Sequence, residues 1–504
     1  MKISDTPSRE QNAPLAQTSP FAHRHPARPT ADRDVRAPIG LRRFAVISLA
    51  SLLLAVPAHA DKPNFLVIVS DDQRPETIRA LGNQHIHTPH LDRLVREGMT
   101  FTRATCAFPL CVPSRAEILT GTAGWKNGVP FAGGRLRKDT VFWADTLRKA
   151  GYHAWYSGKW MNDGKPTTRG YEETSGLFSS GGAGPDGRKP TYGRKGRLIT
   201  GYRGWTFKSN DGKPELEKGV GLVGETSRHI ADGAIKLLQR KPNRPFFLHV
   251  NFTAPHDPLV IPPGYEGKYD PATMPLPKNH LPAHPFDHGN YAGRDEKLLP
   301  WPRTKADVRE EIAAYYAVID DMDAQIGRIL KTLRDIGQYD NTVIIFTSDH
   351  GLALGSHGLM GKQNMYEHTI GVPFIVAGPG VPKNKRTRAQ IHLRDMYPTT
   401  CDLAGIPIPE TVEAKSFAPV LRGGKKRIYP EIYGYFFGYQ RMIRTDRWKL
   451  IHYPKINRYQ LFDLQDDPDE LKDLSKSSAH RPKLNELNGK LTAWFAEQEQ
   501  NRGN

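Results

Sequence analysis

Cysteine is scarce in this sequence, which has only Cys106, Cys111 and Cys401 among 504 residues. So few cysteines exclude a disulfide-based scaffold and leave at least one thiol free. The chain is instead long enough for one large α/β domain and a smaller second one. Its hydrophobic content of 38% and charged content of 25% are typical of a globular protein.

Motifs for nucleic-acid binding are also missing. The formal net charge is +18, and a surface this basic attracts nucleic acid, anionic lipid or an anionic substrate. Because the sequence has no recognition helix, zinc knuckle or RNA-binding aromatic motif, nucleic acid is not expected as a partner. Charge by itself does not choose between lipid and substrate.

An apolar segment near the N-terminus, residues 44–56, follows Arg42-Arg43 and leads to a small-x-small pattern that ends at Ala60. This order predicts a signal peptide cleaved after Ala60, so we expect a periplasmic or secreted protein. The segment is too short to span a bilayer comfortably, so no stable membrane anchor is expected; an uncleaved anchor is the alternative. Residues 1–40 are polar and rich in Pro and Arg, which indicates a long n-region or an upstream start codon.

Strands and helices alternate after this leader. Apolar, β-branched runs predict strands at 64–69, 153–156, 246–252, 342–346 and 373–377. Helical periodicity predicts helices at 89–97, 227–240 and 308–336. This alternation predicts an α/β fold with a large doubly wound, mostly parallel sheet flanked by helices.

Two regions depart from the alternation. Residues 163–222 are rich in Gly, Lys and Arg, and we interpret them as a loop-rich insertion of loops and small hairpins over the mouth of a site. From about residue 427, four short strand patterns (429–435, 440–444, 448–453 and 459–464) and an amphipathic helix predict a smaller antiparallel sheet plus helix. The expected organisation is a leader at 1–60, a catalytic domain at 61–426 and a C-terminal subdomain at 427–504.

Polar side chains follow four of the predicted strands. They are Asp71 and Asp72, Lys159, His256, and Asp349 with His350. Each by itself is an ordinary turn residue, helix cap or solvated side chain. Because ligands bind beyond the carboxyl ends of parallel strands, we expect these residues to converge at one edge of the sheet.

Three carboxylates in one place repel each other and need a cation. Oxygen ligands favour a hard divalent ion, Ca²⁺ or Mg²⁺. His350 is an unusual ligand for Ca²⁺, so the residues leave the choice of ion open.

A candidate nucleophile lies in the string Cys-Val-Pro-Ser-Arg at 111–115, which continues to Thr120-Gly121. Pro113 suits the first turn of a helix, which would place Cys111 at a helix N-terminus, where negative charge is stabilised. A bare Cys-x-Pro would indicate only a structural cysteine. The whole string resembles the formylglycine signature of the sulfatase family.

The resemblance implies a defined chemistry. In the family, a separate maturation enzyme oxidises this cysteine to Cα-formylglycine (3-oxoalanine), and the aldehyde hydrates to a diol. One hydroxyl binds the metal and attacks sulfur, and the second later expels sulfate. A diol oxygen is a hard ligand that suits Ca²⁺, whereas a thiolate is soft.

The resemblance extends over nearly all of residues 61–480 and implies an alkaline-phosphatase-like fold. The matching segments are 69–74, 158–160, 254–258, 347–351, 354–358, 361–362, 395–399, 444–449 and 463–468. Carried over residue by residue, Asp71, Asp72, Asp349 and His350 would hold the metal together with modified Cys111. Arg115 would hold the formylglycine, and Lys159, His256 and Lys362 would contact the sulfate. Either His256 or Lys362 would protonate the leaving alkoxide.

The chain departs from the family near Lys159. Sulfatases often carry a histidine two or three residues after this lysine, where this chain has Met161 and Asn162. That histidine helps to orient the diol and to promote sulfate release. Asn162 and His357 are the two candidates to replace it.

These features predict a sulfatase that acts on an organic sulfate, with a sulfated carbohydrate as the expected substrate and choline sulfate or an aryl sulfate as alternatives. A phosphonate monoester or phosphodiester hydrolase is a related possibility within the superfamily. A non-catalytic binder of sulfated polysaccharide is a third, because the usual histidine is missing and the segment 163–222 is basic.

Overall fold

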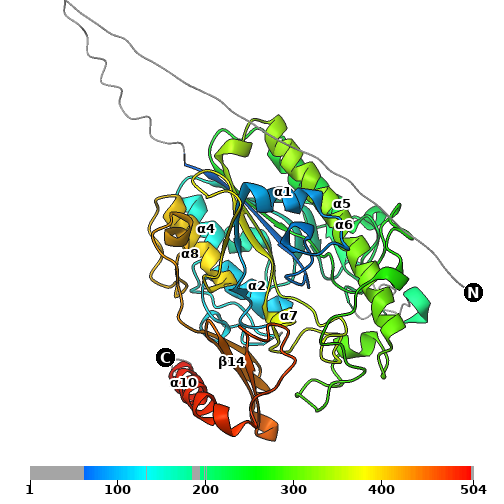
Figure 1. Ribbon diagram of the computed structural model, residues 1–504. Coiled ribbons are helices and arrows are strands. Elements are labelled where there is room, and N and C mark those ends of the chain that lie inside the picture. The colour runs from blue at the N-terminus through cyan, green and yellow to red at the C-terminus, as the bar shows by residue number, and fades with distance from the viewer. Residues whose placement is uncertain (1–61, 132, 184–192, 198, 200, 501–504) are drawn as a thin grey trace, which may run out of the picture. The chain divides into compact units, whose positions relative to one another are not determined.

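The computed structural model describes residues 62–131, 133–183, 193–197, 199 and 201–500 (Figure 1). The chain divides into two units, Met1–Ala58 and His59–Asn504, and the described residues belong to the second. The predicted signal peptide and its cleavage point lie outside the described residues. No helix in the described ranges has both the length and the apolar character needed to cross a bilayer.

A nine-stranded sheet forms the centre of this unit. In sheet order its strands are β10 (Lys385–Thr387), β2 (Gly98–Phe101), β9 (Phe374–Ala377), β8 (Thr342–Ser348), β1 (Asn64–Ser70), β7 (Phe246–Asn251), β4 (His153–Trp160), β5 (Glu173–Ser179) and β6 (Thr206–Lys208). The five strands from β8 to β5 run parallel, while β9 is antiparallel to both of its neighbours and β6 is antiparallel to β5. The predicted mostly parallel sheet is confirmed.

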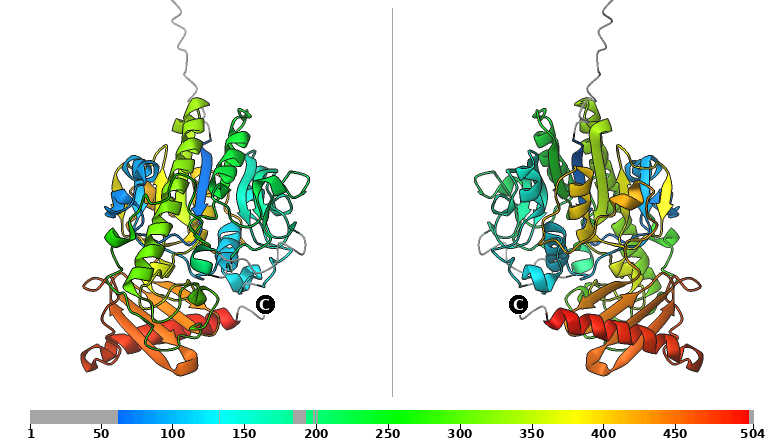
Figure 2. Two further views of the ribbon diagram at one scale, coloured as in Figure 1. Left: turned by 90° about the vertical axis from the view of Figure 1, so that its right-hand side faces the viewer. Right: turned by 90° about the vertical axis from the view of Figure 1, so that its left-hand side faces the viewer.

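Helices cover both faces of the sheet (Figure 2). On one face, α1 (Pro89–Glu97), α5 (Thr226–Leu238) and α6 (Lys305–Asp335) pack against Leu66 and Ile68 of β1. On the other face, α2 (Cys111–Thr120), α4 (Trp143–Lys149) and α8 (Met396–Leu403) pack against Phe65, Val67 and Val69. Successive side chains of a strand point to opposite faces, so an uninterrupted apolar run is what a doubly covered strand needs.

Short elements connect these layers. They are α3 (Gly124–Asn127), α7 (Glu367–Ile370), α9 (Ala418–Leu421) and the two-stranded parallel sheet of β3 (Ala104–Thr105) and β11 (Ile391–His392). Cys106, Cys111 and Cys401 are all buried and unpaired. The described part of the chain is therefore held by packing, without disulfides.

The C-terminal subdomain is a four-stranded antiparallel sheet, as predicted. Its strands, in order, are β12 (Ile432–Phe436), β13 (Gln440–Arg444), β14 (Trp448–Tyr453) and β15 (Arg458–Asp463). Helix α10 (Arg481–Gln500) lies along it and buries Leu484, Leu487, Leu491 and Phe495 (Figure 2). The same apolar core includes Phe108, Met365 and Tyr366 of the larger domain, so the two parts share one packed interface.

The segment 163–222 differs from its prediction as loops and small hairpins. A small hairpin is present, because Lys208 of β6 pairs with Pro214 across the turn that Gly212 closes on Ser209. The segment also supplies β5 and β6 to the main sheet. Their alternating polar residues carry a weak strand signal, and the neighbouring strands supply the pairing that local sequence does not specify.

Strand β4 is longer than predicted and contains Lys159 instead of ending before it. Ser157 and Gly158 are poor strand formers, so the sequence suggests an early end. Gly158 has φ +96°, and a Cβ atom there would lie 1.9 Å from the carbonyl oxygen of Asn251. The absence of a side chain thus allows β4 to continue along β7 and carries Lys159 toward the sheet edge.

Gly158→Ala should therefore lower the melting temperature more than Gly151→Ala does. Both glycines have φ +96°, so both substitutions strain the backbone by about 1–3 kcal/mol. Only position 158 adds a clash, since nothing lies within 4 Å of a Cβ atom at Gly151. Thermal unfolding of the two variants measures the difference, and equal melting temperatures would contradict the close approach of β4 and β7.

Candidate active site

The residues predicted to converge do meet at the carboxyl edge of the main sheet. Asp71 and Asp72 follow β1, and Asp349 and His350 follow the adjacent β8. One ligand atom from each of Asp71, Cys111, Asp349 and His350 lies within 4.8 Å of the others, and all four residues are buried. Asp72, Cys111 and His256 form a second such group.

Backbone hydrogen bonds hold the two acidic loops together. The backbone N–H of Asp72 donates to Asp349 Oδ1 at 3.2 Å, and that of Gln73 donates to Ser348 Oγ at 2.9 Å. Tyr315 of α6 donates its hydroxyl to the carbonyl oxygen of Asp72 at 2.5 Å. Asp72 has φ +66°, a left-handed conformation that turns its side chain back toward the cluster. The loop geometry is therefore fixed from three elements.

Each carboxylate of the cluster faces a cationic side chain. Lys159 Nζ lies 2.6 Å from Asp71 Oδ2, and Lys362 Nζ lies 2.8 Å from both carboxylate oxygens of Asp72. Arg115 Nε donates to Asp349 Oδ2 at 3.0 Å. Burial of this many acids is tolerated only when each one is paired and hydrogen-bonded.

The pairing keeps Asp71 ionised. Burial alone would raise the pKa of Asp71, but the charges of Lys159 and His256 outweigh it and hold this pKa well below its usual range. Burial lowers the pKa of His350, but the charges of Asp349, Cys111 and Asp72 together outweigh burial and raise this pKa to about 9. An imidazole binds metal only when neutral, so a cation at this site would replace that proton.

This donor set fits a divalent cation. Carboxylate oxygens of Asp71, Asp72 and Asp349 are the hard ligands that Ca²⁺ and Mg²⁺ prefer, and His350 adds one nitrogen. The acids lie close enough to repel each other strongly, and a divalent charge among them would relieve that repulsion. The residues present therefore match the predicted metal site, while the choice of ion stays open.

Cys111 is the first residue of α2, as Pro113 predicted. Its Sγ lies 3.5 Å from Asp71 Oδ1 and 3.3 Å from His350 Nε2. Burial raises the pKa of this thiol, but the charges of Lys159 and Lys362 outweigh burial and lower the pKa to about 7. A side chain at position 111 thus contacts Asp71 and His350 and lies within the electrostatic influence of both lysines.

The first turn of α2 is pinned to the acidic loops. Ser114 Oγ donates to the carbonyl oxygen of Asp349 at 2.7 Å, and Arg115 donates to both Asp349 and Asn251. Asn162 Nδ2 donates to the carbonyl oxygen of Val112 at 3.1 Å. These bonds fix where position 111 points.

His256 lies on the open side of the cluster. Its Nδ1 is 2.9 Å from Asp257 Oδ1, and its Nε2 is 3.9 Å from Asp72 Oδ2. Burial lowers the pKa of His256, but the charges of Asp72 and Asp257 outweigh it and raise this pKa well above its usual value. Cys111, His256 and Lys362 line a cavity of about 660 Å³, which is large enough for a sugar-sized ligand.

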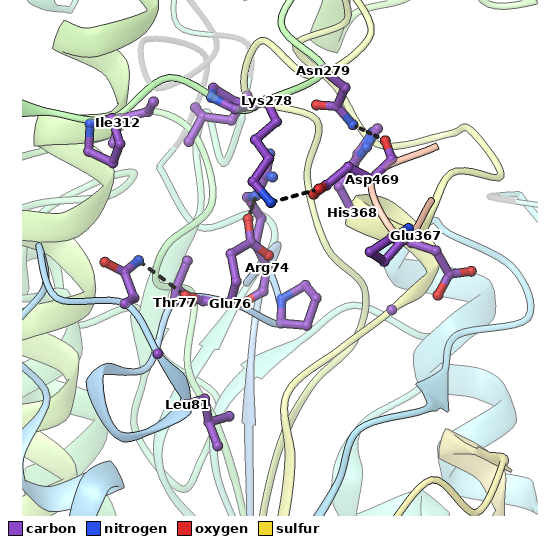
Figure 3. A pocket seen from close by; sticks show the side chains of 18 of the residues that line it. Arg74, Glu76, Thr77, Leu81, Lys278, Asn279, Ile312, Glu367, His368 and Asp469 are labelled. Atoms are coloured by element: carbon purple, nitrogen blue, oxygen red, sulfur yellow. Dashed lines mark hydrogen bonds and ion pairs between the residues drawn. The ribbon is translucent and has the colours of Figure 1, made fainter. Parts of the chain in front are cut away.

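A second cavity, of about 640 Å³, contains none of the predicted metal or catalytic residues (Figure 3). Lys278 and Asp469 form an ion pair of 2.9 Å beside it. Arg74, on its wall, donates to the carbonyl oxygens of Leu352 and Ala353 and so ties the loop after β1 to the loop after β8. Cys111 does not line this cavity.

Two contacting residues were not predicted from the sequence. Tyr202 donates its hydroxyl to Asp71, and its ring lies 4.8 Å from the ring of His256. It belongs to the segment 163–222, which we interpret from the sequence as loops and small hairpins without assigning it site residues. Asn251, the partner of Arg115, is the last residue of β7. A polar residue at the carboxyl end of a predicted parallel strand indicates a site residue, so its position could have predicted this role.

The two candidate replacements for the missing histidine have different outcomes. The hypothesis for His357 is wrong, because its ring stacks on Tyr366 at 3.9 Å and its Nε2 meets Asn279. Asn162 lies beside the nucleophile, but its amide group is engaged with Val112. Met161 lines the cavity. An imidazole does contact position 111, and it is that of His350.

Comparisons with known proteins agree with this geometry. A family model described as Sulfatase matches residues 63–406, and one described as N-sulphoglucosamine sulphohydrolase, C-terminal, matches residues 355–497. The chain is 30% identical to an arylsulfatase of Clostridium perfringens over 84% of this chain and 93% of that protein. It is 28% identical to an N-acetylglucosamine-6-O-sulfatase of Bacteroides thetaiotaomicron over 88% of each. The structure of a phosphonate monoester hydrolase from Silicibacter pomeroyi has a TM-score of 0.69 and 25% identity, over 86% of this chain and 95% of that one.

Addition of Ca²⁺ or Mg²⁺ to protein stripped with a chelator should raise its melting temperature. A cation bound only by the folded state adds about 2.7 kcal/mol of stability at a free concentration 100-fold above its Kd. Asp71→Asn should abolish most of this cation-dependent shift, whereas the exposed control Asp139→Asn should retain it. An undiminished shift in Asp71→Asn, measured by differential scanning fluorimetry, would contradict a metal site at the acidic loops.

Proposed function

The chain belongs to the sulfatase family and is a sulfuric ester hydrolase, and we propose that it cleaves a sulfated carbohydrate through a formylglycine at position 111. The observation that carries this proposal is the string at 111–121, whose first residue lies 3.5 Å from Asp71 and 3.3 Å from His350 at a helix N-terminus. The relative named as an N-acetylglucosamine-6-O-sulfatase supports a carbohydrate substrate.

The proposed reaction needs two groups besides the amino-acid side chains, a formylglycine and a divalent cation. Oxidation of Cys111 by a separate maturation enzyme would give an aldehyde, whose hydrate supplies a hard oxygen nucleophile. A divalent cation, Ca²⁺ or Mg²⁺, held by Asp71, Asp72, Asp349 and His350, would polarise the sulfate and stabilise negative charge in the transition state.

The chain's own cations would bind the sulfate. Lys159 pairs with Asp71 and Lys362 pairs with Asp72 within one buried cluster. Their ammonium groups are therefore placed to bind the oxygens of a sulfate that enters beside them. Arg115 stays on Asp349 and Asn251, where it holds the first turn of α2 and offsets acidic charge. These residues need little rearrangement to receive an anion.

His256 is the better placed of the two candidate acids. Its Nδ1–H donates to Asp257, which is in turn bound by Arg294 at 3.0 Å. Because the pKa of His256 is raised well above its usual value, the ring is an imidazolium and Nε2 carries a proton as well. Lys362 is instead engaged with both oxygens of Asp72. We therefore assign His256 to protonate the leaving alkoxide oxygen as the S–O bond breaks, and Lys362 to bind sulfate.

We also propose that the protein is periplasmic or secreted. The support is the predicted signal peptide before Ala60. An unpaired cysteine in an exported chain then has a chemical reason at position 111, because its maturation removes the thiol.

A phosphonate monoester hydrolase is the second candidate, favoured by the structural likeness to the Silicibacter pomeroyi enzyme. A sulfate monoester and a phosphonate monoester are both tetrahedral and singly charged, so the cationic cluster suits both. Steady-state kinetics on matched aryl sulfate and aryl phosphonate esters separate them, and a higher kcat/KM on the sulfate is expected.

Cys111→Ala should lower kcat/KM on an aryl sulfate by about 10⁴-fold or more, because it removes the nucleophile. Cys401→Ala, which changes a buried thiol in α8, is the matched control and should keep most of the activity. Mass spectrometry of the peptide containing position 111 should show one oxygen gained and one sulfur and two hydrogens lost in active protein. Full activity in Cys111→Ala would refute the proposal, and no activity in matured native protein would favour a non-catalytic binder.

His256→Ala should lower kcat steeply for sulfate esters with poor leaving groups and much less for those with good ones. The physical reason is that a leaving group of low pKa departs without a proton donor. A series of substituted phenyl sulfates measures this slope in the native protein, in His256→Ala and in Lys362→Met. A steeper slope in Lys362→Met than in His256→Ala would move the acid role to Lys362.

A further inference from the structure

The cavity above Cys111 has a wall that comes from the C-terminal subdomain. Its floor contains Cys111, His256 and Lys362, whereas Phe437 and Tyr439, in the turn between β12 and β13, line its side. Lys455, just after β14, lines it too. Residues more than 300 positions apart in the sequence thus surround the space that a leaving group would enter.

The turn presents an exposed aromatic face. Phe437 keeps 38% of its surface exposed, although its ring packs edge-on against Phe108 at 5.5 Å. Its φ of +49° is strained for a residue with a side chain, and such strain persists where the surrounding structure or function requires it. An aromatic ring held in this way at a cavity wall suits the apolar C–H face of a sugar ring.

Lys455 places a positive charge beside this face. Its Nζ lies 4.0 Å from the ring centroid of Tyr439, and it has no ion-pair partner among the described residues. The other cationic side chains that line the cavity are already paired, Lys362 with Asp72 and both Arg294 and His256 with Asp257. The cation–π contact orients Lys455 without neutralising it, so its charge is available to an anion.

The wall is preformed. Gln440, which is fully buried, donates to the carbonyl oxygen of His288 at 3.2 Å and to that of Gln363 at 3.0 Å. Gly289 packs so closely under Tyr439 that a Cβ atom there would lie 2.7 Å from the ring. The turn, the 288–290 loop and the 361–363 segment are therefore fixed to one another, as a specific binding surface requires.

We propose that this wall is a leaving-group subsite for a sulfated sugar that carries a second anionic group, either a carboxylate or another sulfate. The pyranose ring stacks on Phe437, and the second anion binds Lys455. This inference rests on the proposed sulfatase function. It adds a second anionic group as a substrate feature that the catalytic cluster itself does not bind.

The test compares Lys455→Met with Lys415→Met. Lys415 is also exposed and lies 5.0 Å from the ring of Tyr429, but it is not part of the cavity, so it controls for loss of a cation–π lysine. Four substrates are used: an aryl sulfate, a monosulfated hexosamine, the same sugar with a second sulfate, and a monosulfated disaccharide with a uronic carboxylate.

Lys455→Met should lower kcat/KM about tenfold on the saccharide whose second anion the site binds. On the aryl sulfate and the monosulfated hexosamine, which lack a second anion, the loss should be less than about twofold. Lys415→Met should change none of them. Comparison of the two dianionic substrates tells whether Lys455 binds a second sulfate or a carboxylate. Phe437→Ala should weaken both hexosamine substrates alike, because it removes stacking and no charge.

Equal losses on all four substrates in Lys455→Met, or no loss on either dianionic saccharide, would overturn the subsite. Failure of the proposed function is distinguishable, since matured native protein would then not hydrolyse the aryl sulfate at all. Calorimetric binding of the dianionic saccharides to Cys111→Ala gives a readout without turnover. There, combining Cys111→Ala with Lys455→Met should raise Kd about tenfold.

Discussion

The arrangement of the active site depends on three buried carboxylates that lie side by side. Asp71, Asp72 and Asp349 are almost fully enclosed, and like charges at this spacing are stable only beside cations. The chain supplies Lys159, Lys362 and Arg115, one for each acid. A site built in this way is preorganised both for a divalent cation and for an anionic substrate, because it already balances opposite charges in a dry environment.

The sheet topology places these charges. Strands β8, β1, β7 and β4 are neighbours at the centre of the sheet, so their carboxyl ends bring Asp349, Asp71 and Lys159 to one edge. Helix α2 begins at the same edge and points the N-terminal end of its dipole at position 111. The chemistry therefore depends on strand order as much as on the identity of any one side chain.

The C-terminal subdomain is structurally continuous with this site. Glu367 of the larger domain pairs with Arg444 at 2.7 Å and with Lys449 at 3.0 Å, both on the small sheet. Glu470 pairs with Lys449 as well. Burial raises the pKa of Glu470 to about 7, whereas the charges of Arg444 and Lys449 outweigh burial at Glu367 and lower its pKa to about 2. This network ties the small sheet to the larger domain within one compact unit.

The sequence by itself determined the main strands and helices, the C-terminal antiparallel sheet and the identity of the candidate acids, bases and nucleophile. It did so because apolar periodicity and motif spacing are local properties of a chain. Only the tertiary structure decided that Lys159 lies within β4, that β5 and β6 extend the sheet, that Tyr202 binds Asp71 and that His357 stays away from the site. Those outcomes depend on which segments pack together across long sequence separations, and no local pattern records that choice.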